Sequence, residues 1–230
     1  KMLIDFGKAN LLDKAKQQPE KVKEVLDKII VDGPIKTFGA VQDKLNQPFP
    51  LGYSNVGVVV GLGDNIKGFE IGDRVVTNGP HSEFYSITKN LCAKIPEGVS
   101  DEEAAFTIVS SIGLQGIRLA EPNFGETYLV IGLGLIGLIT IQLLKANGCI
   151  VLGIDPDPSK CEIAVSLGIK AKVLKEQSEI VEWCSEQTKT NGVDGTLITA
   201  ATNTSQPIHL AAEVTRKRGK IVQVGATGLN

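Results

Sequence analysis

The sequence predicts an α/β protein in which a small β-barrel precedes a doubly wound parallel sheet. Residues 51–98 contain short apolar runs separated by glycine and asparagine turns, which is typical of a compact barrel. From Thr127 onward, apolar strand-like runs alternate with helical segments, which indicates parallel strands joined by helices. A glycine-rich turn follows the first of these runs, and an acidic residue ends the second.

Composition excludes several classes of protein. The 230 residues carry 24 basic and 26 acidic side chains, so bulk positive potential cannot bind nucleic acid. No apolar run approaches the roughly 20 residues that span a bilayer, and none near Lys1 is long enough for a signal peptide. The cysteines are too scattered for a zinc knuckle and predict the reduced thiols of a cytoplasmic protein: Cys92, Cys149, Cys161 and Cys184.

Residues 1–50 are expected to form a helical arm. Apolar residues recur at helical spacing between Val22 and Ile30, and Asp32-Gly33-Pro34 ends that helix. A second short helix is expected from Lys36 to Leu45. The pair is either a hairpin packed on a neighbour or an arm that binds a partner.

Residues 51–118 form the expected barrel portion and the start of the next helix. Strands are expected within Val56–Val60 and after the Gly72-Asp73 turn. Ser100 and Glu103 make a capping box that opens a helix toward Ser110.

Residues 119–230 form the expected parallel sheet. Five strands are predicted, at Tyr128–Ile131, Cys149–Ile154, Ala171–Leu174, Gly195–Thr199 and Lys220–Val224. The helices between them are expected at Leu135–Asn147, from Pro158 to before Gly168, and near 178–190 and 206–217.

The turn Gly132-Leu133-Gly134-Leu135-Ile136-Gly137 has the spacing of a dinucleotide fingerprint, in its expected place between strand and helix. Gly132 permits the tight turn, Gly134 lets a pyrophosphate approach the backbone, and Gly137 lets the helix pack against the sheet. The first helical turn, with Leu135 and Ile136, presents unpaired N–H groups to that anion.

Asp155 ends the second strand, 18 residues after Gly137, and can accept hydrogen bonds from both hydroxyls of an adenosine ribose. A 2′-phosphate would be repelled there, so NAD is predicted over NADP. Lys160 could reach the same ribose, which keeps NADP open. Alternatives are glycines that serve packing alone, a methyltransferase that uses S-adenosylmethionine and an FAD enzyme. Ile136 argues against the methyltransferase, and the position of the fingerprint within the chain argues against FAD.

With these motifs in view, residues 50–230 resemble the medium-chain dehydrogenase/reductase superfamily, which includes the zinc alcohol dehydrogenases. The resemblance is carried by Gly52–Val59, Gly72–Val75, His81–Phe84, Pro96–Ser100, and the fingerprint with Asp155 and Lys160. It implies a partial GroES-like catalytic barrel at 51–118, a Rossmann domain at 119–230 and a homodimer.

The N-terminal part is similar to a narrower group, the bi-domain oxidoreductases of bacterial polysaccharide biosynthesis. Phe6–Ala9, Lys14–Val22 and Gln47–Asn55 carry this similarity. It implies a second oxidoreductase domain in the parent chain. The Rossmann sheet is expected to lack its last strand, so the chain is expected to be a fragment.

The resemblance also locates the metal positions of zinc enzymes, where this sequence departs from the family. Tyr53 and Ser54 stand at the family's His and Glu positions, and Thr107 matches a Cys. A catalytic zinc needs three protein ligands, so no zinc is predicted.

Without zinc, Tyr53 is the best candidate by position for a hydrogen-bond donor or general acid, although it also suits a structural tyrosine of the barrel. Ser54 and Ser111 are weaker candidates; Ser111 matches a family hydroxyl near the nicotinamide. Thr202 and Gly225 follow the fourth and fifth strands, so they either line the nicotinamide side or are ordinary loop residues.

Two functions remain open at this point. One is a zinc-free oxidoreductase that transfers a hydride between NAD(H) and a small carbonyl, alcohol or sugar-derived substrate. The other is a non-catalytic NAD-binding module with a structural or regulatory role in a larger protein, since fold alone does not determine chemistry.

Overall fold

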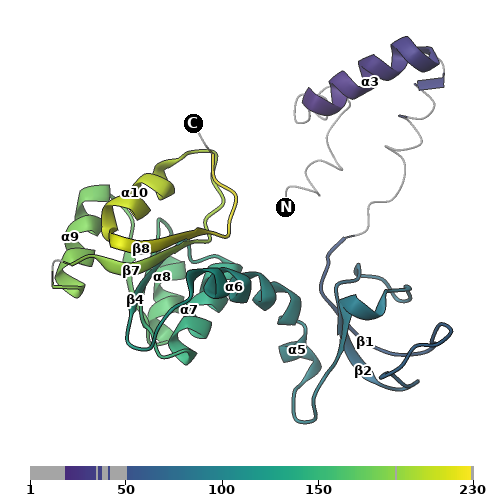
Figure 1. The fold of residues 1–230 in the computed structure, drawn as a ribbon, viewed down its shortest axis with the longest axis horizontal. Coiled ribbons are helices and arrows are strands. Elements are labelled where there is room, and N and C mark those ends of the chain that lie inside the picture. The colour runs from purple at the N-terminus through teal and green to yellow at the C-terminus, as the bar shows by residue number, and fades with distance from the viewer. Residues whose placement is uncertain (1–18, 35, 38–40, 42–50, 190, 229–230) are drawn as a thin grey trace. The chain divides into compact units, whose positions relative to one another are not determined.

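The computed structural model describes residues 19–34, 36–37, 41, 51–189 and 191–228. The chain divides into two compact units, Lys1–Leu51 and Gly52–Asn230, and each is considered by itself. Element labels follow Figure 1. Within the described ranges, no helix combines the length and apolar character that crossing a membrane requires.

The first unit contains the helix α3 (Pro19–Asp32), in the place that the apolar spacing predicts. Gly33 follows it with a positive φ of 83°, and its N–H donates to the carbonyl of Ile29, so glycine ends the helix as expected. Lys36, Thr37 and Val41 are helical, in agreement with the second predicted helix. The remainder of that prediction, with Phe38 and Leu45, lies outside the described residues.

The second unit begins with a small antiparallel sheet in the order β1-β2-β3, which is the described part of the predicted barrel. Its strands are β1 (Asn55–Val58), β2 (Arg74–Thr77) and β3 (Cys92–Lys94), with the short helix η1 (Lys89–Leu91) before β3. The central strand β2 buries Val75, Val76 and Thr77. Gly72, with φ at 95°, makes the turn that leads into it.

The capping box predicted at Ser100 and Glu103 is confirmed, but the helix that it opens is short. α5 (Asp101–Ala104) stops, and α6 (Thr107–Ala120) begins after Phe106. The Ser54 hydroxyl donates to the Ala105 carbonyl at 2.5 Å. In a continuous helix this carbonyl would accept from the N–H of Val109, but here the Ser54 hydroxyl is its donor, and the single predicted helix is instead two.

The five-stranded sheet is parallel throughout and has the order β6-β5-β4-β7-β8. Strands β5 and β6 are added on one side of β4, and β7 and β8 on the other side. The strands are β4 (Thr127–Ile131), β5 (Ile150–Asp155), β6 (Lys170–Val173), β7 (Val193–Ile198) and β8 (Thr215–Gln223). The helices between them are α7 (Leu135–Ala146), α8 (Pro158–Ser166), α9 (Gln177–Gln187) and α10 (Gln206–Val214).

Helices cover both faces of this sheet (Figure 1). Along β4, Tyr128 and Val130 join a core with residues of α6, α7 and α8, whereas Leu129 and Ile131 join a core with residues of α9 and α10. All five residues of β4 are buried, as expected for a central strand covered on both sides. The sequence prediction of a doubly wound sheet is therefore confirmed.

The end of α10 differs from the prediction. The helix stops at Val214, three residues before the predicted end, because Thr215 already pairs with Val193 of β7. The register shifts between Val193 and Gly195, and Arg218 takes a positive φ of 64°. Strand β8 is therefore longer at its start than the apolar run Lys220–Val224 suggests.

Close packing of α6 on the sheet generates a stability prediction. Gly116 is buried, and a Cβ there would lie 2.5 Å from Cγ2 of Val224 and 3.3 Å from Cδ2 of Leu197. We expect Gly116→Val to lower the free energy of unfolding in urea by about 1–3 kcal/mol through overpacking. Gln115→Val is the control on an exposed site of the same helix, and equal losses in both variants would contradict the packing argument.

Candidate functional site

The fingerprint turn leaves β4 at the carboxyl edge of the parallel sheet, at the strand where the sheet order reverses. Gly132 has a φ of 98°, which favours glycine, and a Cβ there would lie 2.7 Å from the Cα of Ala200. Its N–H donates to the carbonyl of Ile154 at 2.8 Å. The first glycine is thus required both by its backbone conformation and by the close approach of Ala200, just beyond β7.

Gly134 is the N-cap of α7, and no atom lies within 4 Å of the position that a Cβ would take. No side chain caps this helix end, and Leu135 in its first turn is 54% exposed. Helix N-termini carry unsatisfied N–H groups and a partial positive charge. The space in front of Gly134 is therefore open to an anion that can accept these hydrogen bonds.

Gly137 brings α7 against the turn itself. A Cβ at Gly137 would overlap the carbonyl oxygen of Gly132 and lie 2.9 Å from Oγ1 of Thr199. The Thr199 hydroxyl donates to that same Gly132 carbonyl at 2.5 Å. Thr199 stands 67 residues from Gly132 and belongs to no local motif, so the sequence alone does not assign it to the site.

Asp155 ends β5 beside the turn, where its side chain is only 5% exposed. Its Oδ2 accepts from the N–H of Leu133 at 2.8 Å, and its Oδ1 accepts from the N–H of Asp157 at 2.9 Å. Lys160 brings its Nζ to 3.4 Å from Oδ1. The structure thus brings the acidic residue and the fingerprint into direct contact through Leu133, which the sequence analysis did not assign to the site.

Lys160 faces a second carboxylate as well, with its Nζ 3.9 Å from Oδ2 of Asp157. Hydrogen bonds from the side chain and backbone of Ser159, together with the charge of Lys160, hold the pKa of Asp157 below its ordinary value. One lysine therefore stands among two carboxylates at this end of β5.

Thr202 and Gly225 lie at the same carboxyl edge, beyond β7 and β8. The Thr202 N–H donates to the Ala226 carbonyl, and Thr202 forms a parallel bridge with Thr227. Gly225 donates its N–H to Ile198, and a Cβ there would overlap the carbonyl of Ala200. The ends of these strands are thereby tied together next to the fingerprint.

The three predicted catalytic residues lie on other elements. Tyr53 precedes β1 and is 53% exposed, and within the described ranges no hydrogen bond engages its hydroxyl. Ser54 donates to Ala105, and Ser111 donates to the Ile108 carbonyl of its own helix at 2.7 Å. Helix α6, which carries Ser111, packs against α7 at Gly113, where a Cβ would lie 2.5 Å from Oγ1 of Thr140.

No three His, Cys, Asp or Glu side chains are grouped to hold a metal ion in the part of the chain that the structure describes. Tyr53, Ser54 and Thr107, which match the zinc positions of the resembling family, supply no such ligand. The donor set at these positions therefore does not fit a catalytic zinc.

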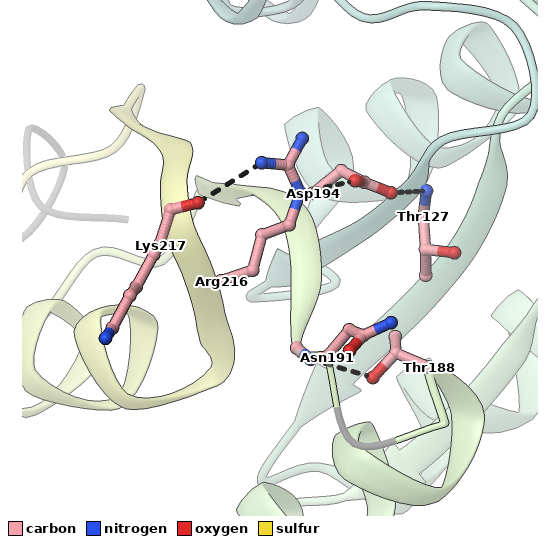
Figure 2. A pocket seen from close by; sticks show the side chains of 7 residues that line it. Thr127, Thr188, Asn191, Asp194, Arg216 and Lys217 are labelled. Atoms are coloured by element: carbon pink, nitrogen blue, oxygen red, sulfur yellow. Dashed lines mark hydrogen bonds and ion pairs between the residues drawn. The ribbon is translucent and has the colours of Figure 1, made fainter.

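A pocket of about 590 Å³ lies at the opposite, amino edge of the sheet (Figure 2). Asp194 at the start of β7 accepts from the Thr127 N–H and from Nε of Arg216, both at 2.7 Å. The bond to Asp194 raises the pKa of Arg216 above its ordinary value. The polar groups at this edge therefore bond one another. At Gly134, in contrast, no side chain caps the end of α7.

Two family models match successive parts of the chain: the alcohol dehydrogenase GroES-like domain over residues 27–127, and the zinc-binding dehydrogenase family over residues 136–230. The first match covers the small antiparallel sheet, and the second covers most of the parallel sheet with its helices. The chain belongs to the medium-chain dehydrogenase/reductase superfamily.

Particular relatives agree with this assignment. The chain is 34% identical to D-guloside 3-dehydrogenase of Escherichia coli over 120 residues, covering 50% of this chain and 34% of the relative. It is 27% identical over 211 residues to sorbitol dehydrogenase of Halalkalibacterium halodurans, covering 77% and 61%. The crystal structure of galactitol-1-phosphate dehydrogenase from Escherichia coli matches with a TM-score of 0.72 at 21% identity, covering 80% and 62%. The chain spans less than two thirds of each of these proteins.

The ion pair at the amino edge generates a second stability prediction. Asp194→Ala leaves the buried Thr127 N–H without its acceptor, so we expect the free energy of unfolding to fall by about 1–3 kcal/mol. Asp101→Ala removes the partner of Arg74 from an exposed ion pair and should cost less than about 1 kcal/mol. Urea titration of both variants compares the losses, and a larger loss for Asp101 would contradict this account.

Proposed function

We propose that the chain binds NAD(H) at the fingerprint turn and serves an oxidoreductase that acts on a small carbonyl, alcohol or sugar-derived substrate without a catalytic zinc. The observation that carries the proposal is the open space at Gly134, in front of the uncapped end of α7 and beside Asp155. Bare backbone, unpaired N–H groups and a neighbouring carboxylate suit a pyrophosphate joined to a ribose. Bound NAD(H) would supply or accept the hydride.

Charge at the end of β5 supports NAD over NADP. Asp155 and Asp157 place two carboxylates near a single lysine, Lys160, so the local charge remains negative. A 2′-phosphate would bring further negative charge against these groups, whereas ribose hydroxyls could donate to them.

Tyr53 is the residue that we propose as the proton donor to the substrate oxygen. A donor needs a hydrogen that is not already committed, and the hydroxyls of Ser54 and Ser111 both donate to backbone carbonyls. The names of D-guloside 3-dehydrogenase and sorbitol dehydrogenase support a hydroxyl or carbonyl of a sugar or polyol as the reacting group.

The second candidate function is a non-catalytic NAD-binding module. It is favoured by the same observation on Ser54 and Ser111, together with the absence of metal ligands at the matched positions Tyr53, Ser54 and Thr107. Cofactor binding without turnover over a broad panel of sugars, polyols and carbonyls would select this alternative.

Titration of the chain with NADH and NADPH tests the cofactor proposal. We expect NADH to bind with a dissociation constant in the low-micromolar to millimolar range, and NADPH more weakly. Gly134→Ala should abolish NADH binding without moving the unfolding midpoint, because its methyl group enters open space where the pyrophosphate would lie.

Gly61→Ala is the matched control. Gly61 also has open space around a Cβ, but it lies in the loop between β1 and β2, away from the fingerprint turn in the sequence. Gly137→Ala should instead lower stability and binding together, because its Cβ overlaps Gly132. Tighter binding of NADPH would contradict the argument from Asp155, and binding of neither nucleotide would reject the proposal.

Tyr53→Phe tests the proton donor. With a substrate that supports NADH oxidation, we expect turnover to fall by about 100-fold or more while NADH affinity is unchanged. Tyr85→Phe is the control, because the Tyr85 hydroxyl is already bonded to Thr77 in the same region. Turnover is measured by the absorbance of NADH. Unchanged turnover in Tyr53→Phe would show that Tyr53 is not the proton donor.

A further inference from the structure

The fingerprint turn is useful to a nucleotide only if its peptide groups are held in one orientation. The chain changes direction within three residues, from the strand end at Ile131 to the N-cap at Gly134. Glycine makes this conformation accessible but does not fix it, because glycine has the largest conformational freedom of all residues. Other groups must therefore hold the turn in place.

Asp155 holds the turn from the side of β5. Its Oδ2 accepts the Leu133 N–H, while its Oδ1 is itself held by the Asp157 N–H. The Leu133 side chain is fully buried over Gly153, where a Cβ would lie 3.0 Å from Cδ2 of Leu133. Backbone and side chain of Leu133 are therefore both anchored on the same strand.

Thr199 holds the turn from the side of β7. Its hydroxyl lies 2.5 Å from the Gly132 carbonyl oxygen and 3.2 Å from that of Ile131. Its N–H donates to Ile131 at 2.9 Å. The Gly132 carbonyl is thus confined between the Thr199 hydroxyl and the Cα of Gly137.

We propose that Asp155 and Thr199 are positioning residues that hold the two peptide groups of the turn from opposite neighbouring strands. The inference rests on the proposed cofactor site and extends it. Asp155 contributes to nucleotide binding through Leu133 as well as through any contact with ribose. Thr199, which touches no part of the open space at Gly134 itself, sets the orientation of the N–H groups that face the pyrophosphate.

Binding of ADP and of 2′,3′-dideoxy-ADP separates positioning from ribose contact. In Asp155→Asn, the amide oxygen is favoured at the Oδ1 position, where the Asp157 N–H and Lys160 both donate, so the Leu133 N–H meets an amide donor instead of an acceptor. We expect this variant to bind both nucleotides at least about fivefold more weakly, the equivalent of one lost hydrogen bond. Thr199→Val should weaken both to a similar extent, and Thr199→Ser, which keeps the hydroxyl, should stay within about twofold of the parent.

Thr188→Val is the matched control at the opposite edge of the sheet, where the hydroxyl bonds Cys184. Isothermal titration of all variants gives the affinities, and the unfolding midpoints show whether each is folded. Loss of ADP binding alone in Asp155→Asn would mean that this residue acts only through ribose hydroxyls, which overturns its positioning role. Unchanged affinities in Thr199→Val would overturn the role of Thr199.

Amide hydrogen exchange of the nucleotide-free chain provides a readout that does not depend on the proposed function. We expect the Leu133 amide to exchange at least about fivefold faster in Asp155→Asn than in the parent, and amides near Thr188 to be unaffected. If the parent binds neither nucleotide, the proposed function fails, but this measurement still tests whether Asp155 holds the Leu133 amide. Unchanged exchange at Leu133 would overturn it.

Discussion

The structure around the candidate site depends on one close approach, between the carbonyl oxygen of Gly132 and the Cα of Gly137. A side chain at Gly137 would separate α7 from the strand that it follows, and a side chain at Gly132 would meet the backbone of Ala200. With the two backbones in contact, the first turn of α7 points its N–H groups past Gly134 into open space. The anion site that we propose at this turn would thus be a consequence of packing, since α7 begins at this contact with no side chain capping its end.

The two edges of the parallel sheet handle polar groups in opposite ways. At the amino edge, Asp194 takes up the Thr127 N–H and the Arg216 guanidinium, so the polar groups of three strands satisfy one another. At the carboxyl edge, the α7 terminus has no capping side chain, and its neighbours Asp155 and Thr199 bond the turn rather than the helix end. The pocket of Figure 2 lies at the amino edge, where the polar groups are already satisfied, so our choice of the carboxyl edge as the candidate site rests on its unsatisfied helix end and not on concavity.

Local patterns in the sequence predict the order of strands and helices, and the fingerprint predicts which strand end carries the site. Features that depend on partners distant in the chain are beyond such patterns. At the break between α5 and α6, the free Ala105 carbonyl accepts from the Ser54 hydroxyl, 51 residues away, and the early start of β8 follows from pairing with β7. Thr199 is similar, because an isolated threonine at a strand end shows no signal until the topology places β7 beside β4. Asp155 was predicted as a ribose ligand from its spacing, but its bond to Leu133 depends on side-chain geometry that spacing does not encode.

If the site works without zinc, as we propose, its chemistry depends on where the hydroxyl hydrogens are directed. A hydroxyl that donates to a carbonyl retains lone pairs and can accept a proton, but it cannot polarise a substrate oxygen without giving up its own bond. Ser54 is in this position, and recruiting its hydrogen would leave the Ala105 carbonyl, at the break before α6, without its donor. Ser111 could exchange its bond within α6 at lower cost, because it lies on an exposed helical surface. Tyr53 carries neither constraint among the described residues. These constraints are our reason for proposing Tyr53 as the acid, and within the same proposal Ser111 is better suited than Ser54 to pass a proton onward.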